Sequence, residues 1–285
     1  MNNCYLCGGT ARHSRGVTRD LPDVGVLECD GCGLVFLSSF DHIEKSHYEQ
    51  SAMHGDTPPP VEQWLHETDA DDERRYRFLQ QALPGRRLLD FGCGVGGFLL
   101  KARQLAAGVE GIEPELRLQS HFNQQGLEVA TGLDGLQATD GYDLITAFHV
   151  IEHLPDPRAM LAQLAARLKT NGELIVEVPS ASDALLNLLD CEAFGQFTYW
   201  SQHLFLFNAT SLTEVVRQAG LELRWLKQVQ RYPLSNHLHW LSRGKPGGHQ
   251  KWAFLDSPAL NEAYSAQLAA LGQCDTLLAG IGARA

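Results

Sequence analysis

Short apolar runs alternate with longer amphipathic stretches through the centre of the chain. The apolar runs cover residues 88–91, 109–112, 142–148 and 173–178. The stretches with helical spacing cover residues 98–106, 115–125 and 159–169. Strands and helices that alternate in this way form a mostly parallel sheet with helices on both faces. The pattern therefore predicts an α/β fold with a doubly wound, Rossmann-like sheet.

The flanking segments have different patterns. A helix is predicted for residues 61–82, directly after the prolines at positions 58–60. Towards the C-terminus, the pattern predicts a helix at 209–219, a strand at 221–229, a helix at 258–271 and a strand at 276–281. A long insert, residues 230–256, follows the first of these two strands. We expect one α/β domain at residues 57–285 and a small module at residues 1–56.

Four of the seven cysteines lie in the first 32 residues and form two Cys-x-x-Cys pairs. The pairs are Cys4 with Cys7 and Cys29 with Cys32. Two thiolates at this spacing hold one ion from a tight turn, and two such turns complete a tetrahedral shell that suits Zn²⁺. In the cytosol, such cysteines are more often metal ligands than disulfides. The sequence predicts a structural zinc ribbon in residues 1–56; the alternative is a group of buried thiols without metal.

Charge and hydropathy limit the partners of the protein. The formal net charge is −11, and residues 1–60 contain four Lys or Arg against eight Asp or Glu. Because phosphate binding needs clustered basic side chains, the balance disfavours a nucleic-acid partner. No apolar run reaches the roughly 18 residues of a membrane span, and no signal-peptide pattern opens the chain. We expect a cytoplasmic protein without a membrane span, and the oligomeric state stays open.

Residues 88–99, LLDFGCGVGGFL, run from an apolar strand through a glycine turn into a helix. Glycines allow the backbone to approach a ligand, and the start of a helix offers free N–H groups. The spacing also matches a dinucleotide fingerprint. However, Asp90 would repel a pyrophosphate, whereas it suits a cationic amino-acid group. Glu113 ends the next strand, where a carboxylate accepts both hydroxyls of a ribose. We find no constellation for hydride transfer in the later segments.

Three segments, in the right order, resemble motifs of class I S-adenosylmethionine (SAM)-dependent methyltransferases. Residues 88–99 resemble the first motif, residues 143–156 the fourth-strand motif with its Glu-His-x-x-Asp ending, and residues 172–179 the fifth strand. The family sheet ends in an antiparallel hairpin, which fits the last two predicted strands. The resemblance covers roughly residues 60–285. It implies an enzyme that transfers a methyl group from SAM.

The resemblance also implies the residues of the cofactor site. They are Asp90, Gly92, Cys93, Gly94, Gly96, Glu113, Asp134 and Phe148. The glycine turn with Asp90 is expected at the methionine end of SAM, Glu113 at the ribose and Asp134 near the adenine. Phe148 stands where the fourth strand delivers residues to the reaction centre.

Methyl transfer to a weak nucleophile needs alignment and a base, and histidine is the natural base near neutral pH. His149 and His153 follow the fourth strand, and His203 lies in the region that usually covers the acceptor. We favour His203 as the base and keep His149 and His153 as candidates. A structural role for His153 is an equally good interpretation.

The four-cysteine module ahead of such a domain also resembles enzymes of sugar and surface-polysaccharide biosynthesis, through residues 28–36. Sugar C-methyltransferases of that group carry a Tyr-x-x-His pattern and a further C-terminal domain. Trp200 stands in place of that tyrosine before His203, and we expect no such further domain. The resemblance therefore implies O-methylation of a sugar hydroxyl or N-methylation of an amino sugar, ahead of C-methylation.

The insert differs from the rest of this acidic chain. Residues 223–255 contain six basic residues, several aromatic residues and no Asp or Glu. The segment GKPGGH, residues 244–249, has backbone N–H groups suited to a phosphate. We expect a phosphate-bearing small-molecule acceptor such as a nucleotide-linked sugar. The alternative is a solvated loop whose aromatic residues pack on the ribbon.

Three rival functions remain at this stage. An rRNA-type methyltransferase fits the basic insert but not the acidic ribbon. A SAM-binding protein without enzymatic activity would use the ribbon for protein contacts. A nicotinamide-dependent dehydrogenase would need only the glycine turn and Glu113.

Overall fold

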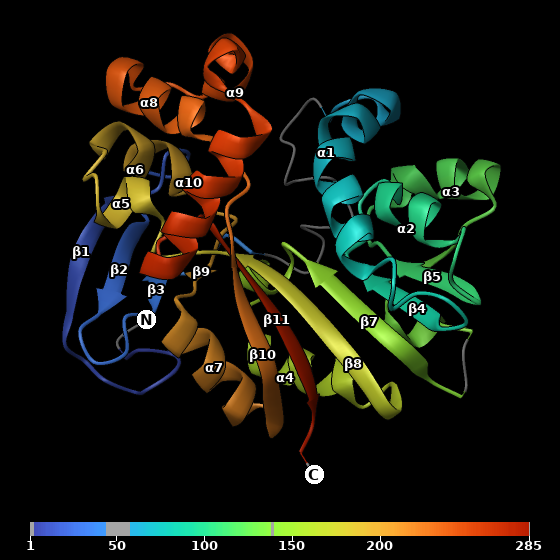
Figure 1. Ribbon diagram of the computed structural model, residues 1–285. Helices are drawn as coiled ribbons and strands as arrows, with labels where there is room; N and C mark the ends of the chain where they lie inside the picture. Colours follow the sequence, from blue (N-terminus) through green and yellow to red (C-terminus); the bar gives the residue numbers. More distant parts are fainter. Residues whose placement is uncertain (1–2, 44–57, 138–139, 285) are drawn as a thin grey trace.

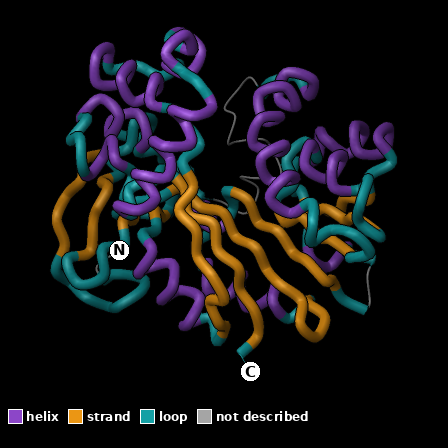
Figure 2. Tube along the Cα trace, viewed as in Figure 1, coloured by secondary structure: helices purple, strands orange, loops and turns teal. Residues whose placement is uncertain are grey.

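The computed structural model describes residues 3–43, 58–137 and 140–284, and contains two sheets (Figure 1, Figure 2). The larger sheet has seven strands in the order β10-β11-β8-β7-β4-β5-β6. The strands are β4 (Arg87–Phe91), β5 (Gly108–Ile112), β6 (Glu128–Ala130), β7 (Tyr142–Phe148), β8 (Leu168–Pro179), β10 (Leu221–Val229) and β11 (Thr276–Ala283). Strands β4 to β8 are parallel, and β11 pairs antiparallel with both β8 and β10. The predicted Rossmann-like sheet is confirmed, including its antiparallel edge.

The central strands are apolar on both sides because both faces of the sheet are covered. In β4, Leu88 belongs to one hydrophobic cluster and Leu89 to the other, and both are fully buried. Leu144 and Ile145 of β7 divide in the same way. Successive side chains of a strand point to opposite faces, so one apolar run supplies two cores.

Helices cover each face of this sheet. On one face lie α1 (Val61–Leu79), α2 (Gly97–Ala102) and α3 (Gln119–Gln125), which contribute Leu79, Phe98 and Phe122 to one core cluster. On the other face lie α4 (Pro157–Ala165) and α7 (Ala209–Gln218). The predicted helix at 159–169 is wrong at its C-terminal end, since Leu168 already pairs with Tyr142 as part of β8.

The smaller sheet joins the N-terminal module to the main domain. Its order is β1-β2-β3-β9, with β1 (Arg12–Val17), β2 (Gly25–Cys29), β3 (Val35–Leu37) and β9 (Phe205–Leu206). Phe205 of β9 pairs with Phe36 of β3, and both rings are buried. The predicted boundary at residue 56 lies outside the described residues. The module and the main domain share this sheet, so the segment that carries His203 is attached to the ribbon.

The insert, residues 230–256, folds into α8 (Leu234–Arg243), α9 (Gly248–Lys251) and η5 (Ala253–Leu255), which join α5 (Ala184–Asn187), α6 (Glu192–Thr198) and α10 (Pro258–Leu271) in one group of helices. We use the name helical cap for these six elements. In Figure 1 the cap lies above the sheet, across from α1. The ring of Trp240 packs on Phe194 and Phe197 of α6, with centroids 5.2 and 5.1 Å away. The alternative of a solvated loop that packs on the ribbon is therefore wrong for Trp240. None of the helices described here is long and apolar enough to cross a membrane.

Candidate functional site

A cavity of about 770 Å³ lies at the carboxyl ends of the parallel strands. It opens beside β4 and β7, where the chain order of the sheet reverses, which is the usual ligand position in open α/β sheets. The loops after β4, β5 and β7 line one side. Helix α1 and the helical cap line the others, so the cavity lies between them.

The glycine turn after β4 forms the floor of the cavity. Asp90, Gly92, Cys93 and Gly94 all line it, as predicted. Gly92 has a φ of 73°, and a Cβ at this position would collide with the side chain of Val150. The position therefore requires glycine for both its conformation and its close packing.

Two carboxyl groups, those of Asp90 and Glu113, line the cavity at this turn. Both oxygens of Glu113 accept backbone N–H groups, one from Gly94 at 2.9 Å and one from Glu115 at 3.1 Å. Asp90 accepts the hydroxyl of Thr146 at 2.7 Å. Burial raises the pKa of both Asp90 and Glu113 to about 7. A cationic ligand would favour their ionised forms, which fits the charge of SAM.

Two predicted cofactor residues do not line the cavity. Gly96 precedes α2 with a φ of 78°, and a Cβ there would lie 2.8 Å from Leu127, so its role is packing behind the turn. Asp134 is exposed in η3 (Leu133–Gly135). The cavity is lined instead by the preceding residues, 131–133. Asp134 is exposed and does not line the cavity, so the lining gives its predicted contact with the adenine no support, and that contact stays a prediction.

Phe148 lies at the end of β7 and lines the cavity. Its ring packs edge-on against Phe98 at 5.2 Å. The guanidinium of Arg75, a residue of α1, lies 4.7 Å from the centroid of the Phe148 ring. Phe148 thus lies at the end of the strand that resembles the fourth-strand motif of methyltransferases, in a cavity wall that also contains the positively charged Arg75.

His149 is held by two buried carboxylates. Its Nδ1 lies 3.2 Å from Glu152 and its Nε2 lies 3.2 Å from Glu177. Burial opposes the charged ring, but the hydrogen bonds to both carboxylates outweigh it and raise the pKa of His149. The residue also has a φ of 55°, fixed by its N–H, which donates to the Glu177 carbonyl at 2.8 Å. Arg231 also lies 3.3 Å from Nε2, so both ring nitrogens of His149 are engaged by protein groups, which leaves the ring poorly placed to accept a proton from an acceptor.

The other two histidines meet at the same carboxylate. The Nδ1 of His153 donates a hydrogen bond to the Gln202 carbonyl at 2.7 Å. Its Nε2 lies 3.9 Å from Oε1 of Glu152. The rings of His153 and His203 are 5.1 Å apart. Burial lowers the pKa of His203 to about 3, so this ring is neutral. The structure thus brings all three predicted histidines to the cavity, around Glu152.

Sequence reasoning missed a group of charged residues on α1. Arg231 donates to Asp71 at 3.0 Å, and Glu177 accepts from Arg74 and Arg75. Although burial alone would raise it, the neighbouring Arg231 lowers the pKa of Asp71 to about 2. The run DADDERR in residues 69–75 was a visible signal for this group. Its partners lie far away in the chain, so the run alone did not identify them.

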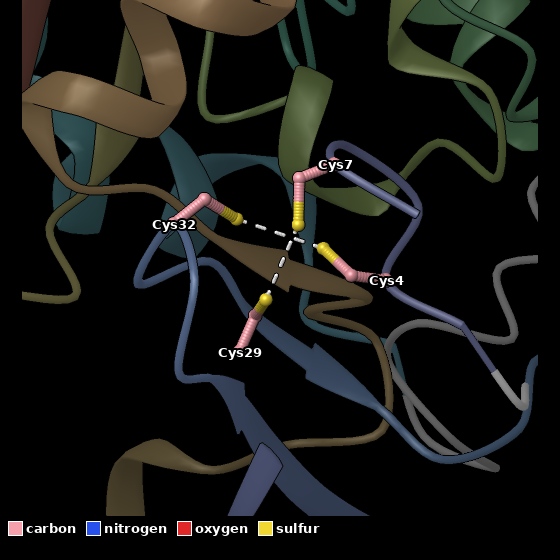
Figure 3. Close-up of side chains that lie close together, drawn as sticks. All are labelled: Cys4, Cys7, Cys29 and Cys32. Atoms are coloured by element: carbon pink, nitrogen blue, oxygen red, sulfur yellow. Dashed lines mark hydrogen bonds between the residues drawn. The ribbon is translucent and has the colours of Figure 1, made fainter. Parts of the chain in front are cut away.

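The four N-terminal cysteines converge on one point (Figure 3). The Sγ atoms of Cys4 and Cys32 are 3.6 Å apart, and those of Cys7 and Cys29 are 3.4 Å apart. Sulfurs 2.3 Å from a tetrahedral zinc would be about 3.8 Å apart. The cluster is therefore compatible with zinc, and the zinc itself stays a prediction.

Comparisons with known proteins agree with this geometry. The chain is 27% identical over 166 residues to a ubiquinone biosynthesis O-methyltransferase of Burkholderia pseudomallei, covering 54% of this chain and 72% of that protein. It is 29% identical over 171 residues to the enzyme of that name from Bordetella avium, covering 55% and 70%. A solved chain from the complex between the Haloferax volcanii Trm112 methyltransferase activator and its methyltransferase partner superposes with a TM-score of 0.52 at 15% identity, covering 79% of this chain and 96% of that one.

The family assignment rests on a model of the methyltransferase domain, which matches residues 65–225. This range includes the glycine turn, Glu113 and all three histidines. The relatives above do not show the predicted link to sugar biosynthesis. The matched range, the Rossmann-like sheet and the cavity at its switch point lead to one conclusion: the chain belongs to the methyltransferase-domain family and is a SAM-dependent methyltransferase.

Proposed function

We propose that this enzyme methylates a hydroxyl group of an aromatic, largely apolar small molecule. The observation that carries the proposal is the composition of the cavity on the side of the helical cap. Its apolar and aromatic lining there consists of Leu185, Phe194, Phe197, Tyr232 and Trp240. Such a wall stacks on an aromatic ring. The names of the ubiquinone biosynthesis O-methyltransferases that resemble this chain support the same class of reaction.

The positions of the basic residues do not favour a phosphate-bearing acceptor. Arg231 is paired with Asp71, and Lys227 lies over the ring of Phe78 at 4.6 Å. The others, Arg224, Arg243, Lys245 and Lys251, are not among the residues that line the cavity. An anion in the cavity would therefore meet little unpaired positive charge.

A sugar acceptor is our second candidate. Asp183, Asn236 and His249 line the cavity beside the aromatic wall. Their polar groups suit sugar hydroxyls, which need several directional partners. A nucleotide-linked sugar, the acceptor expected from the sequence, would have to place its phosphates outside this wall.

For the cofactor, we propose that Asp90, Gly92 and Gly94 hold the methionine end of SAM and that Glu113 binds the ribose. Both carboxyls line the floor that the glycine turn forms. In the reaction, the acceptor O–H bond breaks, the oxygen bonds to the methyl carbon, and the carbon–sulfur bond of SAM breaks. The proton goes to solvent or to His153, because His149 already bridges two carboxylates and burial lowers the pKa of His203 to about 3, which makes it a weak base.

The test uses SAM with an isotopically labelled methyl group and a panel of acceptors. Purified protein should label catechols or related phenols, and should leave nucleotide-linked sugars unlabelled. Phe197→Ala should raise the KM for the phenol several-fold, because the side chain lines the cavity and is 41% exposed. The control is Phe254→Ala, since Phe254 is 78% exposed and does not line the cavity. Labelling of the sugars alone would reject the proposal.

A further inference from the structure

We propose that Glu152, His153 and His203 bind a divalent transition-metal ion such as Zn²⁺ in the wall of the cavity. One ligand atom from each residue lies within 4.8 Å of the other two. Glu152 and His153 belong to η4 (Ile151–His153), and His203 precedes β9. One carboxylate and two imidazoles form the ligand set of many zinc and iron sites with an open position.

The orientation of His153 is the first argument for a cation. Its Nδ1 lies 2.7 Å from the Gln202 carbonyl, which can only accept, so Nδ1 carries a hydrogen. In a neutral ring, Nε2 then presents its lone pair towards Glu152 Oε1, 3.9 Å away. This arrangement is favourable when positive charge, either a proton on Nε2 or a metal ion, lies between the two atoms. A backbone carbonyl on the far nitrogen is also the usual support for a metal-binding histidine.

Unpartnered atoms are the second argument. Glu152 is 0% exposed, and its Oε2 has no hydrogen-bond partner among the residues that the structure describes. The Nδ1 of His203 is likewise buried and without such a partner. Buried polar atoms are normally paired, and a bare carboxylate oxygen is costly. A cation bound by these residues would reduce the cost of burying them.

Nearby cations do not fill this role. His149 contacts Oε1 of Glu152 and leaves Oε2 without a partner. Arg75 and Arg231 direct their guanidinium groups to Glu177 and Asp71. No described Arg or Lys side chain is therefore shown in contact with Oε2 of Glu152.

The cluster needs only a small contraction to hold an ion. Ligand atoms about 2.1 Å from a tetrahedral zinc lie about 3.4 Å apart, compared with the limit of 4.8 Å found here. His153 and His203 both line the cavity, so the fourth position would open to the acceptor. An acceptor hydroxyl there would lose its proton more readily, to solvent, before the oxygen attacks the methyl carbon. This last role rests on the proposed function, whereas binding of the ion does not.

The test is the metal content of the full-length protein. After saturation with Zn²⁺ and desalting, the wild type should contain two zinc ions per chain, one in the four-cysteine cluster and one in this cluster. Glu152→Gln and His203→Asn should each retain one. The matched control is His249→Asn, because His249 also lines the cavity but lies outside the cluster. It should retain two.

Co²⁺ substitution identifies which site is lost. Thiolate-to-cobalt charge-transfer bands should persist in Glu152→Gln, and only the weaker bands of a nitrogen- and oxygen-bound ion should disappear. Calorimetry with S-adenosylhomocysteine confirms that each variant is folded. One zinc per chain in the wild type, or two in Glu152→Gln, would overturn the proposal. If the wild type contained two zinc ions but did not methylate phenols, the proposed metal site would be supported and the proposed acceptor would be rejected.

Discussion

At the scale of single residues, the proposed cofactor site depends on two carboxyl groups that are hard to ionise. Burial raises the pKa of Asp90 and Glu113 to about 7. Both pKa values exceed those of an unfolded chain, near 4. These groups therefore stabilise the folded protein below pH 4, and that contribution is lost as the pH rises through 7. A bound cation would offset the loss.

The affinity for SAM should consequently rise between pH 6 and pH 8. We expect up to about a tenfold increase for each carboxyl that must ionise. Asp90→Asn should reduce the affinity and flatten the profile, and it should raise the melting temperature of the ligand-free protein at pH 8 but not at pH 4. Titration calorimetry and thermal unfolding measure the two effects. The exposed Asp134 provides the control, Asp134→Asn, and an unchanged pH profile in Asp90→Asn would contradict the assignment.

A second prediction at this scale separates two reasons for a glycine. Gly85 and Gly92 both have a φ of 73°, but a Cβ at Gly85 would meet no atom within 4 Å, while one at Gly92 would collide with Val150. Gly85→Ala should cost about 1 kcal/mol through backbone strain alone. Gly92→Ala should cost more and should also weaken SAM binding. Urea unfolding measures the loss of stability, and calorimetry measures the affinity for SAM. Equal losses of stability in the two variants would show that the protein relieves the collision with Val150.

At the scale of elements, an ion pair ties α1 to the connection between β10 and α8. Arg231 donates to Asp71, and its backbone N–H donates to Asp275 at 3.1 Å. Arg74 links the same helix to Glu177 at the end of β8, at 2.9 Å. The side chains of Asp71 and Arg231 are each 24% exposed, so this ion pair is neither fully buried nor freely accessible to solvent. These contacts join the two walls of the cavity.

Loss of this ion pair should therefore destabilise the protein. Arg231→Met should lower the free energy of unfolding by roughly 1–3 kcal/mol, since it leaves Asp71 partly buried without its partner. The double variant Asp71→Asn, Arg231→Met should lose less than the sum of the single variants. Because the pKa of Asp71 is lowered to about 2, the contribution should persist above pH 4 and fade towards pH 2.

Denaturant unfolding at several pH values checks this prediction. Arg217 forms an exposed ion pair with Glu214 on α7, so Arg217→Ala should change stability little. Strictly additive effects of the two substitutions would indicate that Asp71 and Arg231 do not interact in solution.

At the scale of the whole molecule, the four-cysteine cluster supports more than its own module. Cys29 ends β2, which pairs with β3, and β3 pairs with β9. His203 lies two residues before β9. Metal binding by the cysteines would therefore stabilise the segment that places His203 in the cavity wall.

Removal of one cysteine ligand should reveal this connection. Cys29→Ser should lower the zinc content by one ion per chain, lower the melting temperature and increase hydrogen exchange across Phe205–Leu206. Methyl transfer should fall with it. The control is Cys191→Ser, which changes a half-buried cysteine outside the cluster. If β9 in Cys29→Ser exchanged its amide hydrogens as slowly as in the wild type, metal binding by the cysteines would not stabilise the segment that carries His203.

The sequence was informative wherever a local pattern carries the information. The periodicity located six of the seven strands of the larger sheet, all except the short β6, and the turn at 92–94 was expected to bind the cofactor. Asp90 and Glu113 were predicted from their place at strand ends, and both line the cavity. Asp134 lies in an exposed 3-10 turn, η3, outside the cavity lining, and its role at the adenine stays a prediction. The end of α4 was wrong because β8 begins before its apolar run does.

What the sequence alone determined is the set of parts: an alternating α/β sheet, a glycine turn and a four-cysteine group. Periodicity, left-handed glycines and close ligand spacing are properties of neighbouring residues. Only the tertiary structure decided that Arg231 neutralises Asp71, 160 positions away, and that His203 meets Glu152. Burial and charge depend on which distant segments approach each other. The role of each histidine was therefore beyond the reach of the sequence.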